Sequence, residues 1–380
     1  MDNIRTQALV IGGGPAGAAA ARRLAEHSIS TLLLERDLTY TKPCGGAIPS
    51  SAIVELGIPD SVIRNHVTKI KVFSPKGESV SIDLEGGTFC ITERHELDST
   101  LRKTAADKGA SIIEAEFLRF ESRGKQIISV ARKRATGEEF RITSDYVIAC
   151  DGITFRAASS AGLQKPEFVY TISAYLKPDD YSADTCEFWF GNEHSMLSYS
   201  WIFPASDFLS VGTGNEDPKL LTNTINGFME RRFNMDIDSI RNERFISKMR
   251  AFRIPLWSKP VYNLDNLLFA GDAGYTVMPV SYEGIYYSMR SGQLAADAVA
   301  AGNPGQYKKE WNKAYRARFI MMSMIRKHLL SKTDNIEKWI LLHQRKEVQE
   351  LAMRLWLRKE ASRRSLLSYI GLFRHIIKIW

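Results

Sequence analysis

Short apolar runs alternate with glycine-rich turns at the start of the chain. Ala8-Leu9-Val10-Ile11 is followed by glycines and by an alanine-rich stretch, and Thr31-Leu32-Leu33-Leu34 is a second apolar run. A continuous apolar run of this length, bounded by glycine, is typical of a strand buried on both faces of a parallel sheet. Residues 1–40 therefore predict a strand, a helix and a second strand, in that order.

Two other patterns predict the remaining elements. Apolar residues alternate over residues 67–92 around Pro75-Lys76-Gly77, as in a β-hairpin, and recur every four residues over 93–109, as in a helix. Similar runs predict strands at residues 111–120, 126–132, 139–143, 146–150, 171–176, 186–190, 198–203, 208–212 and 267–270. Helical spacing predicts helices at residues 222–233 and 284–301, and an almost entirely helical segment over 306–380.

The first turn carries glycines at the spacing of a dinucleotide-binding loop. Gly12, Gly14 and Gly17, with Pro15 and Ala16 between the last two, lead from the first predicted strand into the first predicted helix. The first glycine permits the tight turn, the second lets backbone amides approach a pyrophosphate, and the third lets the helix pack close to the strand. The anion would lie at the helix N-terminus, where free amides and the helix dipole favour negative charge.

A carboxylate at the end of the second strand completes this pattern. Glu35, with Arg36 beside it, lies where an acidic side chain can accept hydrogen bonds from the ribose hydroxyls. The pattern indicates a dinucleotide but leaves both FAD and a nicotinamide cofactor open.

Two later turns favour FAD. Asp151-Gly152 follows one buried strand and Gly271-Asp272 follows another, and no second GxGxxG loop is present for a resident nicotinamide. In this order the three turns resemble the FAD-binding set of the flavoprotein hydroxylase superfamily. The resemblance implies that Asp272 contacts the ribityl and pyrophosphate region. It also implies that the helix opening at Gly284 and Ile285 directs its N-terminus toward the flavin.

Two arginines lie on the helix predicted over 93–109. Arg94 resembles the arginine that contacts the FAD pyrophosphate in this superfamily, whereas Arg102 is expected to be an exposed helical charge.

The element order then predicts an α/β fold with α+β features. It consists of a Rossmann-like FAD-binding domain, an inserted β-sheet substrate domain and a C-terminal helical tail. The discontinuous FAD-binding domain is expected to comprise residues 1–165 and 262–302, and to include the hairpin 67–92 as an excursion. The β-rich substrate-binding domain is expected at residues 166–261, and the basic helical region at residues 303–380.

Three further motifs narrow the resemblance to one family. They are Lys42–Pro49, which contains Pro43-Cys44-Gly45-Gly46, then Tyr199-x-Trp201-x-Phe203-Pro204, and Glu283–Met289. These segments resemble the geranylgeranyl reductase family, in its chlorophyll and bacteriochlorophyll branch, and the likeness spans essentially the whole chain. The resemblance implies an FAD-dependent reductase that saturates C=C bonds of a geranylgeranyl chain, on a pigment ester or on geranylgeranyl diphosphate. The lack of a second dinucleotide loop permits either transient NADPH or reduced ferredoxin as the electron donor.

The family likeness also implies roles for particular residues. Cys44 would deliver or position a proton, and Gly45 and Gly46 would let the loop approach the flavin ring. The alternative is that Cys44 is a small buried apolar residue, as most free cysteines are. Tyr199, Trp201 and Phe203 occupy alternate positions of a strand and so share one face, which predicts a wall for an apolar polyprenyl chain or else an aromatic core stripe.

Pro204 and Tyr282 are assigned to the same predicted substrate site. Two departures from the family pattern lie near this site. Gly274-Tyr275 follows Ala273 where the family shows Ala-Gly, and Tyr282 stands where the family has a small residue.

The composition indicates a globular protein and argues against a metal site and a disulfide framework. The chain is 44% hydrophobic and 25% charged, as is ordinary for a globular protein. Its four cysteines contain no CxxC pair and its seven histidines no HxxxH pair, so neither a metal site nor a disulfide framework is expected. The first strand starts within ten residues of Met1, which leaves no room for a signal peptide. We therefore expect a cytoplasmic protein without a metal.

The basic charge is concentrated at the C-terminal end. The net charge is +8, yet residues 301–380 alone contain 18 Lys and Arg against 6 Asp and Glu, so the rest of the chain is slightly acidic. A solvated helical face, an anionic membrane surface and a diphosphate each fit this charge, whereas no motif accompanies it for nucleic acid. Residues 365–380 predict an amphipathic helix with Trp380 as an interfacial anchor, which would give peripheral contact with the inner face of a membrane. The alternative is a helix that packs on the protein and closes the substrate tunnel.

The sequence leaves three rival functions open. They are an FAD-dependent monooxygenase acting on an aromatic or polyketide substrate, a reductase of another polyprenyl lipid such as an archaeal-type lipid or a prenylquinone, and a non-catalytic flavin electron-transfer protein. A monooxygenase would consume oxygen, and an electron-transfer protein would need no aromatic wall.

Overall fold

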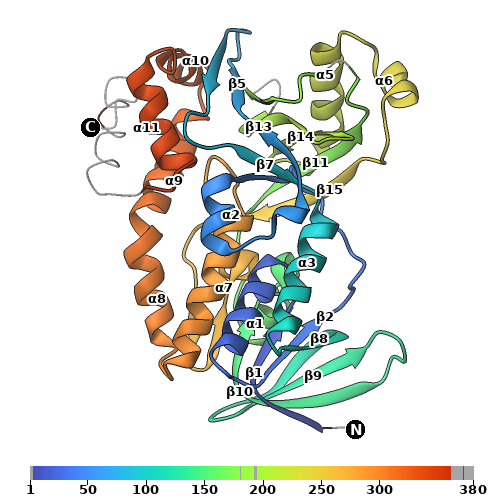
Figure 1. Cartoon of the computed structure of the whole chain (residues 1–380), viewed down its shortest axis with the longest axis vertical. Helices are drawn as coiled ribbons and strands as arrows, with labels where there is room; N and C mark the ends of the chain where they lie inside the picture. Colours follow the sequence, from blue (N-terminus) through green and yellow to red (C-terminus); the bar gives the residue numbers. More distant parts are fainter. Residues whose placement is uncertain (1–2, 180, 192–194, 361–370, 372–380) are drawn as a thin grey trace.

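Two sheets lie along the long axis of the molecule, and helices run beside them (Figure 1). The computed structural model describes residues 3–179, 181–191, 195–360 and 371, and every structural statement below refers to these residues. The predicted α/β class with a dinucleotide-binding sheet is confirmed.

The first sheet is built around the parallel strands that the apolar runs predict. In the described part of the chain its strands are β1 (Asn3–Ile11), β2 (Thr31–Glu35), β8 (Ser111–Arg123), β9 (Ile127–Lys133), β10 (Glu139–Ala149), β16 (Asn263–Leu264) and β17 (Leu267–Phe269). β1 pairs in parallel with β2 and β10, β2 pairs with β8, and β10 pairs with β17. β9 runs antiparallel to both β8 and β10. The carboxyl ends of β1, β10 and β17 therefore meet at one edge, where the three predicted turns emerge.

The helices α1 (Pro15–Glu26), α3 (Arg94–Asp107) and α7 (Ile285–Ala300) lie on this sheet (Figure 1). Two glycines permit their close packing. A Cβ at Gly17 would lie 1.8 Å from the carbonyl oxygen of Gly12, and one at Gly292 would lie 2.1 Å from that of Ala16. Gly17 thus lets α1 pack close to the strand, as the sequence predicts for the third glycine of the loop. Gly292 lets α7 cross α1 with their backbones in contact.

The second sheet carries the predicted aromatic strand. Its order is β15 (Arg250–Pro255), β11 (Phe168–Leu176), β14 (Leu209–Asn215), β13 (Ser195–Pro204), β12 (Thr185–Gly191), β5 (Lys69–Phe73) and β6 (Ser79–Asp83). All neighbours are antiparallel except β12 and β5. The predicted hairpin exists as β5 and β6, and it extends this second sheet. Helices α5 (Leu221–Phe233) and α6 (Ile237–Glu243) pack against it around a separate apolar cluster.

Several short elements join the two sheets and lack a periodic signal in the sequence. They are the small sheet β3 (Ala47–Pro49), β7 (Phe89–Thr92) and β4 (Ile63–Val67), and the helices α2 (Ser50–Leu56) and α4 (Arg156–Ser160). Strands of three to five residues contain too few positions to establish an alternation.

The C-terminal helices run along one side of the molecule from the first sheet to the second (Figure 1). They are α8 (Gly305–Trp311), a π-helical turn (Asn312–Arg316), α9 (Ala317–Leu329), α10 (Thr333–Leu342) and α11 (Lys346–Trp356). The helix predicted over residues 365–380 lies outside the described residues, and its membrane contact stays a prediction. Among the described helices, none is long and apolar enough to cross a membrane.

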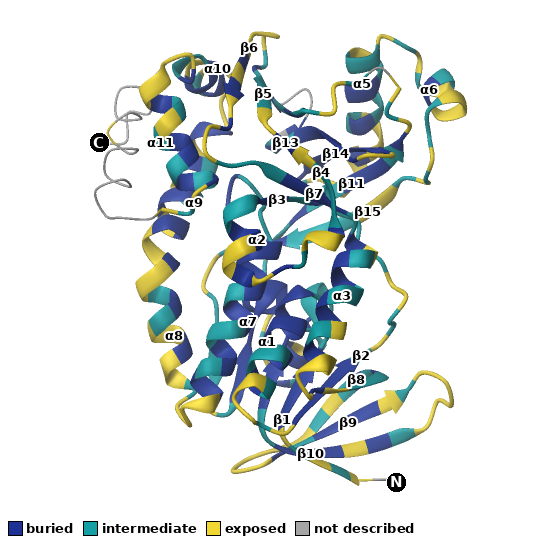
Figure 2. Ribbon diagram, viewed as in Figure 1, coloured by how far each residue is buried: buried dark blue, intermediate teal, exposed yellow. Residues whose placement is uncertain are grey.

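Burial follows this layering. Figure 2 shows the central strands of the first sheet and the inward faces of α1 and α7 as buried, with exposed positions on the outer helix faces and at the hairpin tips. The last four residues of β1 and the first four of β2 are buried, as expected where a parallel sheet is covered on both faces.

Candidate active site

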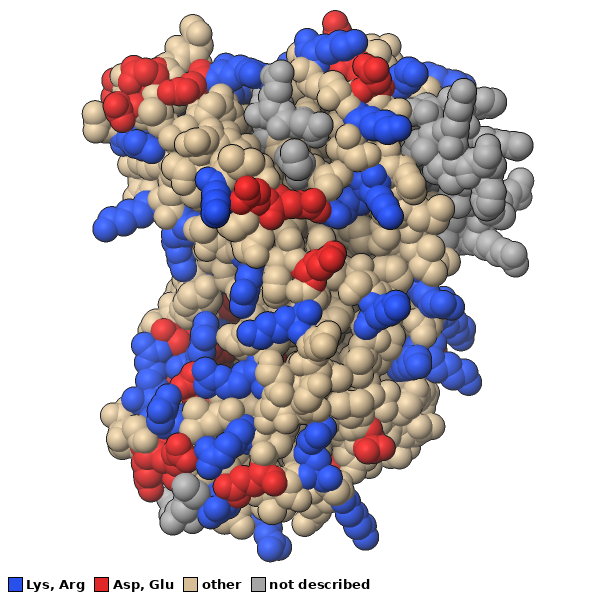
Figure 3. All heavy atoms as spheres, turned by 180° about the vertical axis from the view of Figure 1, so that it is seen from behind, with Lys and Arg blue, Asp and Glu red and all other residues tan. Residues whose placement is uncertain are grey.

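A cavity of about 450 Å³ is lined by residues of both sheets and of the helices around them. Ligand pockets typically enclose about 300–1,000 Å³. The space-filling view shows the waist of the molecule hollowed on its rear face, with Lys and Arg side chains gathered around the hollow (Figure 3). The predicted site residues that line the cavity are Gly12, Gly14, Pro15, Ala16, Glu35, Arg36, Cys44, Gly45, Arg94, Asp151, Gly152, Tyr199, Trp201, Phe203, Gly271, Asp272, Tyr282, Gly284 and Ile285.

Three predicted site residues lie outside the cavity wall. Gly17 packs on the backbone of Gly12, and Pro204 follows the last cavity-lining residue of β13. A Cβ at Gly46 would lie 2.2 Å from the carbonyl oxygen of Thr92. The Thr92 amide donates a hydrogen bond to the carbonyl oxygen of Gly46. Gly46 is thus needed for the contact with β7, and the approach of its loop to the flavin stays a prediction.

The glycine loop forms an anion cradle. Gly12 has φ +100°, and a Cβ there would lie 2.3 Å from the carbonyl oxygen of Cys150. A Cβ at Gly14 would meet nothing within 4 Å. Gly14 begins α1 without a side-chain cap, and the first turn of the helix contains no acidic residue. No acidic side chain of its first turn compensates the positive end of α1, which suits an anionic ligand such as a pyrophosphate.

Arg102 is a cavity residue, and its prediction as an exposed charge is wrong. The side chain is only 7% exposed, and its guanidinium donates to the carbonyl oxygens of Gly13 at 3.3 Å and Leu38 at 2.9 Å. Arg94, Asp98 and Arg102 recur every four residues, so they form one stripe of α3 that turns toward the cavity. That charged stripe, beside the apolar stripe of the same helix, is the signal that could have identified Arg102.

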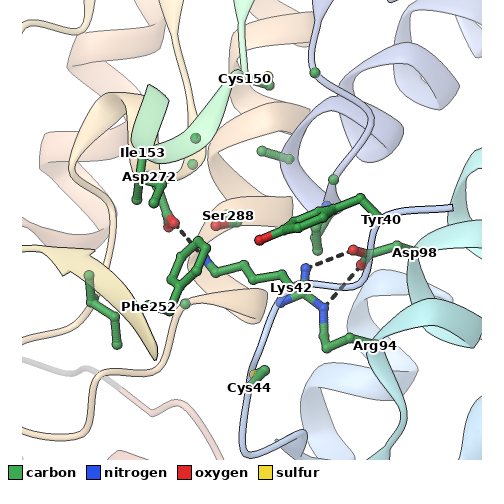
Figure 4. A pocket seen from close by; sticks show the side chains of 18 of the residues that line it. Tyr40, Lys42, Cys44, Arg94, Asp98, Cys150, Ile153, Phe252, Asp272 and Ser288 are labelled. Atoms are coloured by element: carbon green, nitrogen blue, oxygen red, sulfur yellow. Dashed lines mark hydrogen bonds and ion pairs between the residues drawn. The ribbon is translucent and has the colours of Figure 1, made fainter. Parts of the chain in front are cut away.

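Acidic groups occupy the other turns. Glu35 accepts a hydrogen bond of 2.6 Å from the Gly13 amide, and Asp272 accepts one of 2.6 Å from the Lys42 ammonium (Figure 4). Asp151 accepts from the amides of Arg156 and Ala157 through one carboxylate oxygen. Burial raises the pKa of Asp151, and its other oxygen is buried without a partner. An unpartnered oxygen on the cavity wall fits a ligand that brings hydroxyl donors.

The N-terminus of α7 is also open to the cavity. Gly284 caps this helix without a side chain, and its first turn contains no acidic residue. The carboxylate that precedes it, Glu283, is paired with Lys359, whose ammonium lies 2.6 Å away and 5.1 Å from the ring of Tyr286. Lys359 is nearly buried, and this burial lowers its pKa. The pairing neutralises the Glu283 carboxylate beside a helix end that would face the flavin.

The Cys44 loop lies between α3 and the aromatic strand. Cys44 is half-buried, and its sulfur accepts a 3.4 Å hydrogen bond from the Gly46 amide. A Cβ at Gly45 would lie 2.7 Å from the ring of Phe203, so the loop is pressed against that aromatic side chain. Cys44 therefore lines the cavity wall and also packs against the main apolar cluster.

The aromatic side chains of β13 face the cavity together. Tyr199, Trp201 and Phe203 all line it, and Phe188 of β12 packs against the first and last of them at 5.3 and 5.1 Å between ring centroids. A Cβ at Gly212 would lie 2.3 Å from the Trp201 ring, so this glycine lets the indole lie against β14. The result is an apolar surface with few free hydrogen-bonding groups.

Tyr282 holds a strained turn beside this wall. Tyr282 has φ +50°, and Val280 has φ +76°. Residues other than glycine rarely adopt a positive φ. The Tyr282 hydroxyl donates to the Leu197 carbonyl oxygen at 2.6 Å and accepts from Arg326 at 2.7 Å, and burial raises the Tyr282 pKa. Arg326 comes from α9, so the C-terminal helices contact the Tyr282 turn of the cavity wall.

Comparisons with known proteins agree with this geometry. The family described as "FAD binding domain" matches residues 5–321. The chloroplastic geranylgeranyl diphosphate reductase of Oryza sativa is 30% identical, over 85% of this chain and 75% of that protein. The geranylgeranyl diphosphate reductase of Rhodobacter capsulatus is 29% identical, over 95% of this chain and 93% of that protein. The crystal structure of a geranylgeranyl bacteriochlorophyll reductase-like protein from Thermoplasma acidophilum has the same fold, with a TM-score of 0.82 at 20% identity, covering 99% of this chain and 100% of that one.

Proposed function

Because this chain belongs to the geranylgeranyl reductase family of FAD-binding proteins, we propose that it is an FAD-dependent reductase that saturates C=C bonds of a geranylgeranyl chain. The observation that carries the proposal is the shared cavity. It joins a glycine-lined anion cradle to an apolar aromatic wall, and Cys44 lies on the same surface.

Several residues fit the cofactor. The amides at the start of α1 and the Arg102 guanidinium would hold the pyrophosphate, and Glu35 would accept from the adenosine ribose. Asp151 and Asp272 would accept from the remaining hydroxyls. When bound and reduced, FAD would supply a hydride to the substrate.

The other residues of the cavity act on the alkene. An isolated trisubstituted C=C bond has no carbonyl to stabilise developing charge, so a proton must reach one carbon as the hydride reaches the other. Tyr199, Trp201 and Phe203 would bind the polyprenyl chain by apolar contact and keep water out. Cys44 would donate the proton from its thiol and later regain one from solvent, so that each saturated bond gains one hydride and one proton.

Product mass tests this proposal directly. Dithionite-reduced protein would be mixed anaerobically with geranylgeranyl diphosphate and, separately, with a geranylgeranyl pigment ester. We expect one of them to gain two hydrogen atoms per saturated bond and no oxygen. An unchanged mass of both substrates would contradict the proposal, and an oxygenated product formed under air would identify a monooxygenase. The same assay with NADPH or reduced ferredoxin in place of dithionite would identify the donor.

Replacing Trp201 with leucine should weaken substrate binding. The variant removes much of the aromatic surface and the bond from the indole nitrogen to the Ser210 hydroxyl, which is 3.4 Å long. We expect KM for the polyprenyl substrate to rise about tenfold, which corresponds to ~1.4 kcal/mol, with a smaller effect on kcat. Trp257→Leu, outside the cavity wall, is the control and should leave KM unchanged. Equal KM values for the two variants would contradict the proposal that Trp201 binds the polyprenyl chain.

Replacing Lys359 with methionine should shift the midpoint potential of bound FAD. Glu283 would then oppose the negative charge of the reduced cofactor at the N-terminus of α7. An effect of about 1–2 kcal/mol corresponds to a potential lower by ~20–40 mV for two electrons. Spectroelectrochemistry would measure it. The exposed Lys346→Met is the control, and the double variant Lys359→Met/Glu283→Gln should restore the potential. A potential unchanged in Lys359→Met would show that this pair does not act on the flavin.

A further inference from the structure

Four aromatic rings form a row along the cavity wall. The ring centroids of Phe203 and Trp201 lie 6.3 Å apart, and those of Trp201 and Tyr199 lie 6.2 Å apart. Tyr282, from the turn before α7, continues the row at 6.2 Å from Tyr199. All four residues line the cavity, and Phe203 lies against the Gly45 backbone. The row thus leads from the loop before β3 to the turn before α7.

Reciprocal hydrogen bonds hold the Tyr282 end of this row in place. The Tyr199 hydroxyl of β13 donates to the Ser281 carbonyl oxygen of the turn, at 2.6 Å. The Tyr282 hydroxyl of the turn donates to the Leu197 carbonyl oxygen of β13, also at 2.6 Å, and accepts from Arg326 of α9. The strand, the turn and α9 therefore fix the last ring together.

The backbone at this end favours glycine, yet it carries larger residues. Leu197 has φ +56°, beside the positive φ of Val280 and Tyr282 already described. Residues other than glycine keep such a conformation only where the surrounding structure fixes them, and they cluster at ligand clamps. A bulky ring at position 282 therefore points to a role for the ring itself.

The groups behind the Tyr282 ring lie outside the cavity wall. Leu197 and Arg326, which bond to its hydroxyl, do not line the cavity, and neither does Glu216, the ion-pair partner of Arg326. The ring thus separates the cavity from a buried ion pair. Because the Arg326 charge is already paired, this end suits the apolar end of a polyprenyl chain and not an anionic headgroup.

We propose that Tyr282 determines specificity for chain length, because its ring ends the channel that runs along β13 and limits the polyprenyl chain that the cavity accepts. The inference rests on the proposed function, which places a polyprenyl chain on this wall. A chain that lies along the row meets the Tyr282 ring last. One further isoprene unit would have to displace a ring that is bonded to two elements, and the cost of such overpacking opposes the gain from added apolar contact.

Equilibrium binding of prenyl diphosphates tests the inference without turnover. FAD-loaded, oxidised protein would be titrated by calorimetry with farnesyl, geranylgeranyl and geranylfarnesyl diphosphate, each one isoprene unit longer than the one before. We expect the unaltered protein to bind the geranylgeranyl compound most tightly. In Tyr282→Gly the affinity for the geranylfarnesyl compound, relative to the geranylgeranyl compound, should rise about tenfold, because loss of the ring makes room for the added unit.

Further variants separate chain length from damage to the fold. Tyr282→Phe keeps the ring but loses both hydroxyl bonds, and it should keep the preference of the unaltered protein. Tyr282→Asn introduces a short side chain that tolerates a positive φ, and it should shift the preference as glycine does. Asn234→Gly changes another residue with a positive φ, +51°, at the C-cap of α5 and outside the cavity wall, and should leave the preference unchanged. Arg326 keeps its partner Glu216 in each variant, and retained flavin absorbance would show that the fold is intact.

The outcomes distinguish this inference from the proposed function. An unchanged preference in Tyr282→Gly and Tyr282→Asn would overturn the inference, even if the protein reduces geranylgeranyl chains. An unaltered protein that binds none of the three compounds, or binds the geranylfarnesyl compound most tightly, would overturn it as well. A shifted preference in a protein that reduces no alkene would overturn the proposed function and leave Tyr282 as the end of a prenyl-binding channel.

Discussion

Replacing Cys44 with alanine is expected to slow alkene reduction by about 10²–10⁴-fold, the range that general acid catalysis contributes. The thiol lies on the cavity wall, where its sulfur accepts a hydrogen bond from the Gly46 amide, and alanine removes its proton without adding bulk. The rate of product formation would be measured by mass under anaerobic conditions. The flavin absorbance should persist, because Cys44 contributes no group to the anion cradle.

Matched variants make this result specific. Cys90→Ala removes a buried thiol outside the cavity and should leave the rate unchanged. Cys44→Ser keeps a hydroxyl of similar size but of much weaker acidity, and should remain slow. Full activity in Cys44→Ala would show that the proton comes from another group and would remove this residue from the mechanism.

Replacing Gly14 with alanine is expected to weaken FAD binding by about 100-fold, or ~2.7 kcal/mol, without destabilising the FAD-free protein. The backbone at Gly14 has φ −72° and ψ −173°, which alanine adopts freely, and the new methyl group would meet nothing within 4 Å. The methyl group would instead point into the space that the pyrophosphate needs, since this glycine lets the backbone approach it. FAD affinity by titration and the Tm of the FAD-free protein would be compared.

Gly227→Ala is the control for this variant. It also gives a methyl group with nothing within 4 Å, but it lies within α5, away from the cavity. It should leave FAD affinity unchanged and stabilise the protein by about 0.5–1 kcal/mol, as alanine does in a helix. If Gly14→Ala bound FAD as tightly as the unaltered protein does, the proposed role of Gly14 in pyrophosphate binding would be contradicted.

Much of this site could be predicted because its parts are local in the sequence. The loop from Gly12 to Gly17 directly follows its strand, and the alternation of Tyr199, Trp201 and Phe203 places them on one face of β13. Such patterns report local geometry whatever the rest of the chain does.

The remaining parts depend on contacts between distant segments. Lys359 pairs with Glu283, and Arg326 bonds to Tyr282, across intervals that no periodic pattern describes. Arg102 turns inward because α3 presents its charged stripe to the cavity, which depends on where the loop before β3 lies. The hairpin of β5 and β6 is predicted as a hairpin, but its pairing with β12 depends on an edge that the local sequence does not specify. The C-terminal segments thus supply the partners of Tyr282 and Glu283, next to the cavity wall, which the sequence pattern alone did not indicate.

Anaerobic stopped-flow absorbance tests the central claim, that this cavity passes reducing equivalents from FAD to an alkene. Protein with fully reduced FAD would be mixed with geranylgeranyl diphosphate or the pigment ester, and the flavin spectrum would be followed. The product mass in quenched samples would be measured by mass spectrometry. We predict that one substrate reoxidises the flavin and that one bond is saturated per flavin reoxidised. Flavin that stays reduced with both substrates, with no saturated product, would contradict the account.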